Sequence, residues 1–158
     1  MLAFGTENEE VNRFSRLAPF VLSVTDDADN QLRIVIALPA DAKEPEQADP
    51  RLAAILADAK KVDADLDRLY EIRFETYILY QCRNESYTAF DPHEVIRGKH
   101  LVIYEKSPLL DFYQSIICDI DYDHEKADRK HYGILAENHI LDIIANEPPV
   151  ITRITADP

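Results

Sequence analysis

LYEIRFETYILYQCRNESYT, residues 69–88, has the clearest periodicity in the chain and decides the expected fold. Most of its even positions are apolar, whereas most of its odd positions are charged or carry an amide. Successive side chains of a β-strand point to opposite faces of the sheet, so this alternation predicts one long, central strand. Apolar Tyr77 and Leu79 on the odd face indicate that a helix or a neighbouring loop covers the sheet there. Because the run is longer than most strands, we expect a bend near Thr76 or beyond Cys82.

Other parts of the chain also have strand-like patterns. Two β-rich runs flank the turn-rich sequence DDADN, which predicts a hairpin over residues 20–38. HLVIYEK predicts a strand over 100–106, and the Ser-Pro pair at 107–108 predicts the start of a helix that packs on the sheet. Residues 131–145 predict one or two strands interrupted by a polar stretch. PPVITRI, which follows, predicts a short edge strand.

Two more helices are expected in the first half of the chain. Thr6 or Asn8 can cap a helix that ends at Leu17. An Asp-Pro pair at 49–50 predicts the start of a second helix, whose apolar residues have helical spacing over 50–62. Strand patterns without regular alternation of strand and helix predict an α+β fold. We therefore expect a single domain over 1–158, with a mainly antiparallel sheet and two or three covering helices.

The composition narrows the classes of partner. The 158 residues include 30 acidic and 17 basic side chains, a formal net charge of -13, and 46% are hydrophobic. A nucleic-acid-binding protein usually carries basic residues that neutralise phosphates, so direct nucleic-acid binding is not expected. The acidity has two interpretations: it keeps the protein in solution, or it steers a basic protein partner toward the surface.

The compartment is inferred from the cysteines and the apolar runs. Cys82 and Cys118 are far apart and have no metal-binding or redox spacing, so both are expected to behave as small hydrophobic residues in a reducing compartment. The first residues lack a basic and apolar leader, and no apolar run approaches 18 residues. The sequence therefore predicts a cytoplasmic protein without membrane contact.

Metal and cofactor signatures are weak. Asp119, Asp121 and Asp123 have the alternate spacing of the first ligands of a calcium loop, but His124 and Lys130 stand where that loop needs glycine and glutamate. The five histidines show no zinc-binding spacing. With only three glycines in the chain, the glycine-rich loops of dinucleotide and phosphate binding are excluded. We expect no metal and no cofactor.

Signs of nucleophilic catalysis are equally weak. Ser86, His139 and Asp142 can be assembled into a Ser-His-Asp set, but a chain of this size offers such a set by chance. No GxSxG elbow is present to expose the serine. We therefore assign no catalytic residue, and an enzymatic activity is the less favoured interpretation.

A polar cluster at the end of the long strand is the best candidate binding site. Its residues satisfy the amides of a turn, or they form a binding patch with a second polar group near residue 131. The first group comprises Arg83, Asn84, Glu85, Ser86 and Tyr87, and the second comprises Lys130, His131, Tyr132, Asn138 and His139.

The order of four segments, YILYQCRNESYT, KSPLLDFY, KHYGI and ENHILDII, is similar to that in a family of small uncharacterised bacterial proteins. Arg-Asn-Glu-Ser-Tyr, Lys-His-Tyr and Asn-His-Ile segments of the same kind recur in that family. The resemblance covers residues 69–147, about half of the chain. It implies a bacterial, cytoplasmic origin and carries no known activity.

We expect the protein to act through contact with another protein. Its small size, its acidity and the lack of a catalytic signature favour an immunity-type inhibitor that binds a basic toxin or nuclease. Asp119, Asp121 and Asp123 are the candidate acidic interaction face. The alternative is a small enzyme or ligand-binding domain, whose polar cluster consists of Asn84, Glu85, His131 and His139.

Overall fold

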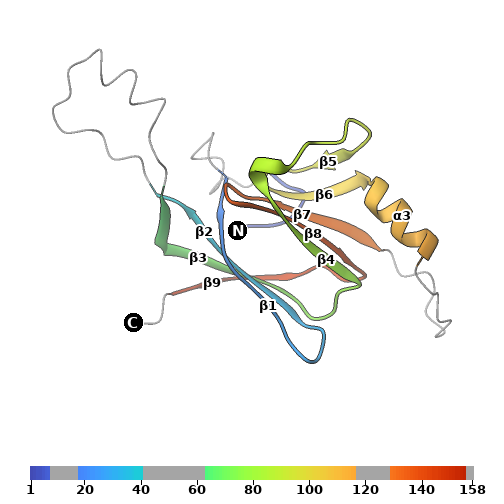
Figure 1. The fold of residues 1–158 in the computed structure, drawn as a ribbon. Helices are drawn as coiled ribbons and strands as arrows, with labels where there is room; N and C mark the ends of the chain where they lie inside the picture. Colours follow the sequence, from blue (N-terminus) through green and yellow to red (C-terminus); the bar gives the residue numbers. More distant parts are fainter. Residues whose placement is uncertain (8–17, 41–62, 117–128, 156–158) are drawn as a thin grey trace, which may run out of the picture.

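The computed structural model describes residues 1–7, 18–40, 63–116 and 129–155, which form two antiparallel sheets packed face to face (Figure 1). Sheet A has the strand order β1-β2-β3-β9, with β1 Phe20–Asp26, β2 Leu32–Pro39, β3 Ala64–Phe74 and β9 Val150–Ile154. Sheet B has the order β4-β8-β7-β6-β5, with β4 Leu79–Asn84, β5 Val95–Arg97, β6 Leu101–Lys106, β7 Lys130–Leu135 and β8 His139–Ala145.

The hydrophobic core lies between the two sheets. Phe74 of sheet A and Tyr132 of sheet B meet edge to face, with ring centroids 5.4 Å apart. Phe4, from the segment before β1, contacts both rings. Buried aliphatic side chains from both sheets surround this aromatic trio, and they include Leu32, Ile34, Ile36, Ile72, Leu101, Ile134, Leu141 and Ile143. Each sheet therefore covers the apolar face of the other.

The long strand expected over residues 69–88 is two strands in different sheets. The chain leaves sheet A after Phe74, crosses at residues 75–78 and enters sheet B as β4. Tyr77 anchors the crossover, because its Oη donates a hydrogen bond of 2.7 Å to Asp26 Oδ2 at the end of β1. The hydrogen bond to Asp26, followed by partial desolvation, raises the pKa of Tyr77 to about 12. The bend that the length of the run indicates thus separates β3 from β4.

The expected α+β fold with two or three covering helices is wrong for the described residues, because the layer that covers each sheet is the other sheet. They contain one α-helix, α3 Pro108–Ile116, and none of its residues is buried. The helix begins at the expected Ser-Pro pair but does not serve as a covering layer. The helix expected from Thr6 or Asn8 to Leu17 lies outside the described residues beyond Glu7, and the helix expected over 50–62 lies wholly outside them. No described helix has the length and apolar character needed to span a bilayer.

The hairpin and edge-strand predictions are confirmed. β1 and β2 pair antiparallel across the DDADN turn, where Asp27 Oδ1 accepts hydrogen bonds from two backbone amides and Asn30 adopts a positive φ of 59°. Asparagine tolerates that left-handed conformation better than most residues. β5 with β6 and β7 with β8 form further hairpins, and β9 is an edge strand that pairs, among the described strands, only with β3.

We expect Phe74→Ala to lower the free energy of unfolding by about 3–5 kcal/mol, because it removes a fully buried ring from the contact between the sheets and leaves a cavity. The exposed crossover residue Thr76 is the control, and Thr76→Ala should change stability by about 0.5 kcal/mol or less. Urea unfolding curves measure both values. Similar losses for the two variants would contradict the packing of sheet A on sheet B.

Candidate functional site

The outer face of sheet B, which points away from sheet A, contains a buried carboxylate. Asp142 lies on β8 between Leu141 and Ile143, which both belong to the core. Because side chains alternate along a strand, Asp142 points to the opposite, outer face. Only 1% of it is exposed. A buried carboxylate is costly unless cations and hydrogen-bond donors surround it.

The strands on either side of β8 provide these donors. On β4, Gln81 Nε2 donates to Asp142 Oδ2 at 2.8 Å, and Arg83 donates to the same oxygen from Nε at 3.0 Å and Nη2 at 2.9 Å. On β7, His131 Nε2 lies 3.1 Å from Asp142 Oδ1. The antiparallel register explains the convergence, since Gln81 and Gly133 both pair with Asp142.

His131 links this cluster to the start of α3. The ring is 1% exposed, and its Nδ1 lies 2.7 Å from the Oγ of Ser107, which is 4% exposed. Ser107 Oγ also accepts a hydrogen bond from the amide of Leu110, as a residue at a helix start commonly does. One assignment satisfies all groups: the serine hydroxyl donates to Nδ1, and Nε2–H donates to Asp142.

Tyr104 covers His131 from the neighbouring strand β6. The two rings stack with centroids 3.8 Å apart and planes 5° apart. The phenol ring lies across Gly133, where a Cβ atom would meet Tyr104 Cε2 at 2.7 Å. A side chain at position 133 would therefore displace the ring that covers His131, which accounts for a glycine in the middle of β7.

The electrostatics of the cluster follow from burial and from these partners. Burial alone would raise the pKa of Asp142, but the hydrogen bonds from His131 and Gln81 and the charge of Arg83 outweigh it and lower the pKa below its ordinary value. Glu94 lies within reach of the same charges, and its pKa is raised by burial and by Asp142. Burial also raises the pKa of the Tyr104 hydroxyl.

Ser107, His131 and Asp142 have the composition of a catalytic triad, but they satisfy one another. In a hydrolase the serine oxygen must reach a substrate carbonyl, and nearby donors must stabilise the oxyanion. Here Ser107 is buried, which keeps a substrate carbonyl away from its oxygen, and that oxygen also accepts a hydrogen bond from the Leu110 amide. The network is therefore a support that joins β4, β8, β7 and the start of α3.

The segment that follows β4 is exposed and rich in aromatic residues. Tyr87 is 89% exposed and Phe90 is 67% exposed, and Val95 and Ile96 of β5 are exposed as well. All four lie within ten residues of sequence, next to the short 3-10 helix η1 Glu85–Tyr87. Large apolar side chains gathered on an exposed segment are typical of a contact surface. We call residues 85–97 the aromatic segment.

Local hydrogen bonds hold the aromatic segment in one conformation. Asn84 Oδ1 accepts from the amide of Ser86, and Thr88 Oγ1 donates to the carbonyl of Asn84. Further along, Asp91 Oδ1 accepts from the amide of His93 at 2.8 Å. Turns closed by their own side chains lose less conformational freedom on binding than an open loop.

The sequence-predicted binding residues fall into separate groups. Arg83 and His131 meet at Asp142, whereas Asn84 ends β4 and Glu85 and Tyr87 lie in η1 at the start of the aromatic segment. Asn84 pairs with His139 across the β4–β8 ladder. Neither joins His131, because His131 pairs with Ile144 at the other end of β8. The register therefore does not bring Asn84, Glu85, His131 and His139 to one point.

Asn138 and its neighbour Glu137 connect the two sheets. Asn138 Oδ1 accepts from the amide of Val21 at 2.9 Å, and its Nδ2 donates to the carbonyl of Val21 at 2.8 Å. Glu137 Oε1 accepts from the amide of Ala18. These hydrogen bonds thus join the β7–β8 turn to the start of β1. Ser86 also lies apart from Asp142, in η1.

The candidate acidic face at Asp119, Asp121 and Asp123 lies outside the described residues. Within the described ranges, no three His, Cys, Asp or Glu side chains are grouped so that they could hold a metal ion.

Three residues of the network around Asp142 were missed by sequence reasoning, namely Gln81, Tyr104 and Ser107. The available signal was Asp142 itself, a lone charge inside the apolar run ILDII.

In comparisons with known proteins, no family model, no curated protein and no solved structure matches this chain. The function therefore has to be inferred from the residues of the chain itself.

We expect Asp142→Asn to lower the free energy of unfolding at pH 7 by about 2–3 kcal/mol, because the charge-assisted hydrogen bonds to the buried carboxylate are lost while Arg83, whose side chain is 37% exposed, stays partly solvated. The native pKa of Asp142 is lowered, so its stabilising charge is complete above the ordinary value near 3.9. That contribution is lost as the pH falls through the lowered native pKa.

Urea unfolding at a series of pH values from 7 to 2.5 measures this difference, which should be constant near neutrality and shrink below about pH 4. The exposed Asp67→Asn is the control and should change stability by about 0.5 kcal/mol or less at pH 7. A difference between wild type and Asp142→Asn that persists unchanged at pH 2.5 would show that the charge of Asp142 is not the stabilising element.

Proposed function

We propose that the protein acts by binding another protein, as an immunity-type inhibitor that occupies a basic toxin or nuclease. The observation that carries the proposal is the exposure of Tyr87 and Phe90 on a segment held by its own turns. Tyrosine and other aromatic residues are enriched among the residues that dominate binding at protein interfaces.

Charge supports a basic partner. The net charge of the chain is -13, and the aromatic segment carries Glu85, Asp91 and Glu94 against a single arginine, Arg97. Apolar anchors surrounded by acidic side chains fit a partner surface with an apolar pocket inside a basic rim. Long-range attraction between the two proteins would raise the association rate more than it raises the affinity.

The buried network gives the aromatic segment a fixed base. β4 is an edge strand, and Gln81 and Arg83 fasten it to Asp142 immediately before the segment begins. At the other end, β5 pairs with β6. Both ends of residues 85–97 are therefore fixed to sheet B, which limits the free energy lost when a partner orders the surface.

The similarity of the RNESYT, KHYG and NHILDII segments to a family of small bacterial proteins stays a prediction. A bacterial, cytoplasmic origin would place the protein beside the toxins and nucleases that such inhibitors neutralise.

The test begins with affinity capture from the native cell, using the wild-type protein and the double variant Tyr87→Ala, Phe90→Ala in parallel. We expect a basic protein that is retained by the wild type alone. With that partner purified, the double variant should bind on the order of 1,000-fold more weakly, because each aromatic anchor contributes about 2 kcal/mol and every 1.4 kcal/mol is about tenfold in affinity. The association rate of the wild type should fall steeply as salt screens the charges over about 8 Å at physiological ionic strength.

Leu22→Ala with Leu66→Ala is the matched control, since both leucines are exposed on strands of sheet A. It removes apolar surface elsewhere and should leave the affinity unchanged. Equal weakening by the two double variants, a captured protein without a basic surface, or no captured protein would each contradict the proposal.

A further inference from the structure

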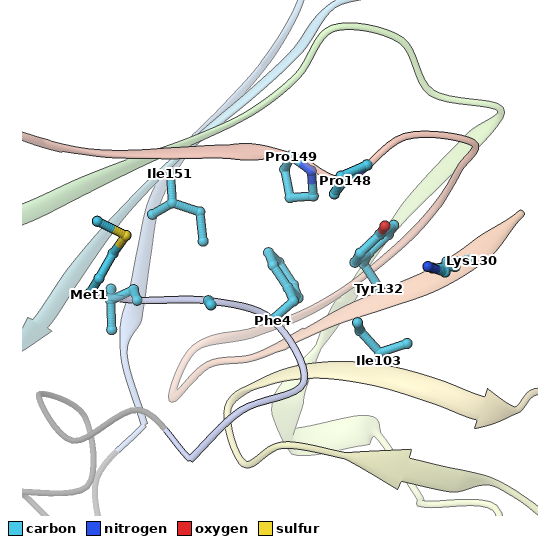
Figure 2. A pocket seen from close by; sticks show the side chains of 10 residues that line it. Met1, Phe4, Ile103, Lys130, Tyr132, Pro148, Pro149 and Ile151 are labelled. Carbon is cyan, nitrogen blue, oxygen red and sulfur yellow. The ribbon is translucent and has the colours of Figure 1, made fainter. Parts of the chain in front are cut away.

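A pocket opens at one corner of the sandwich, where the N-terminal segment meets β6, β7 and the link between β8 and β9. Its volume is about 330 Å³, at the lower end of the roughly 300–1,000 Å³ of small-molecule sites. Figure 2 shows side chains from four separate parts of the chain converging on it. They are Met1, Leu2, Ala3, Phe4, Ile103, Lys130, Tyr132, Pro148, Pro149 and Ile151.

The first wall is the N-terminal segment, which is fixed to sheet B. The amide of Gly5 donates to the carbonyl of Leu101 at 2.8 Å, and Arg97 Nη1 donates to the carbonyl of Gly5 at 3.0 Å. Gly5 has a positive φ of 71°, a conformation that glycine adopts without strain. The turn there directs Leu2 and Phe4 inward, where both are buried.

The opposite wall is equally constrained. Pro148 and Pro149 join β8 to β9, and the ring of each proline fixes its φ near -65°. Ile151 of β9 continues this wall (Figure 2). The floor is formed by Phe4 and Tyr132, whose rings meet edge to face at 5.3 Å. Because walls and floor are held by the fold, a ligand would not need to order them.

Two of the lining side chains are polar, and both can donate hydrogen bonds. Lys130 is exposed at the start of β7, whereas Tyr132 is buried with its ring against the core. The ammonium group of a lysine carries a positive charge and has no acceptor, so a head group beside Lys130 has to accept hydrogen bonds and not donate them. The remaining lining is apolar. A matching ligand would therefore have an apolar body and one accepting, negatively charged head near Lys130.

We propose that this pocket binds a small hydrophobic carboxylate, with its apolar part against Phe4, Ile103 and Ile151 and its carboxylate at Lys130. None of the lining residues belongs to the aromatic segment, and the proposal does not depend on the proposed inhibitor function.

The probes are octanoate, octanol and octylammonium, which share a chain and differ in the head group. Calorimetric titration of the full-length protein, at probe concentrations below micelle formation, should give the order octanoate, octanol, octylammonium from tightest to weakest. Lys130→Met keeps the apolar stem of the lysine and removes the ammonium group. It should weaken octanoate binding by about tenfold, because a charge-assisted contact is lost, and leave octanol binding unchanged.

Lys106→Met is the matched control, because Lys106 is also exposed on sheet B but does not line the pocket. Ala3→Phe places a ring in the pocket from the N-terminal segment and should abolish binding of all three probes while the circular dichroism spectrum stays native. Undetectable octanoate binding to the wild type, or octanoate binding retained by a folded Ala3→Phe variant, would overturn the site. Equal octanoate affinity in the wild type and Lys130→Met would overturn the carboxylate assignment.

Discussion

The carboxylate of Asp142 is buried on the outer face of sheet B, and several other features of that sheet compensate for the free-energy cost of burying this charge. Moving an ionised carboxylate out of water costs several kcal/mol even after the protein relaxes. Gln81 and Arg83 from one neighbouring strand and His131 from the other offset it through four contacts with the two oxygens. Because three strands contribute, the carboxylate fixes their register as well as its own environment.

The residues that contact Asp142 need hydrogen-bond partners and packing neighbours of their own. When His131 donates to Asp142 from Nε2, its Nδ1 is left as a buried acceptor, and Ser107 provides the partner for that nitrogen at the start of α3. Tyr104 then stacks on one face of the imidazole ring, and its own ring in turn needs a glycine at position 133. One buried charge thus accounts for a capped helix, a stacked aromatic pair and a glycine within a strand.

The even-and-odd alternation over residues 69–88 predicts strands correctly but cannot show that the chain changes sheets. Tyr70 and Phe74 face inward from sheet A, and Tyr80 packs against the same core from sheet B. In a sandwich both inner faces point to one core, so the parity of apolar residues continues through the crossover at 75–78. The pattern therefore looks like one strand in one sheet, and helices then seem necessary to cover it.

The site was only partly predictable for a related reason. Ile140 and Ile144 are apolar on the same face as Asp142, which indicates that this face is buried and that the carboxylate needs a partner. The identity of that partner depends on which residues lie opposite Asp142. That pairing is set by the register of β4 and β7, which no residue pattern within β8 encodes. The sequence therefore singles out Arg83 and His131 as polar residues but does not show that both contact Asp142.

The two crossings between the sheets explain where unfilled or exposed surface remains. The chain passes from sheet A to sheet B at residues 75–78 and returns at 146–149. At the first crossing Tyr77 packs on Tyr80 and closes the gap, with ring centroids 5.2 Å apart. At the second, two prolines form the link, and prolines cannot donate the backbone hydrogen bonds that would extend a strand over the corner. The N-terminal segment closes that corner only in part, which is why the pocket lies there. The aromatic segment is at neither crossing, since it follows β4 and includes β5 within sheet B, and no second layer formed by the described residues covers its large exposed side chains.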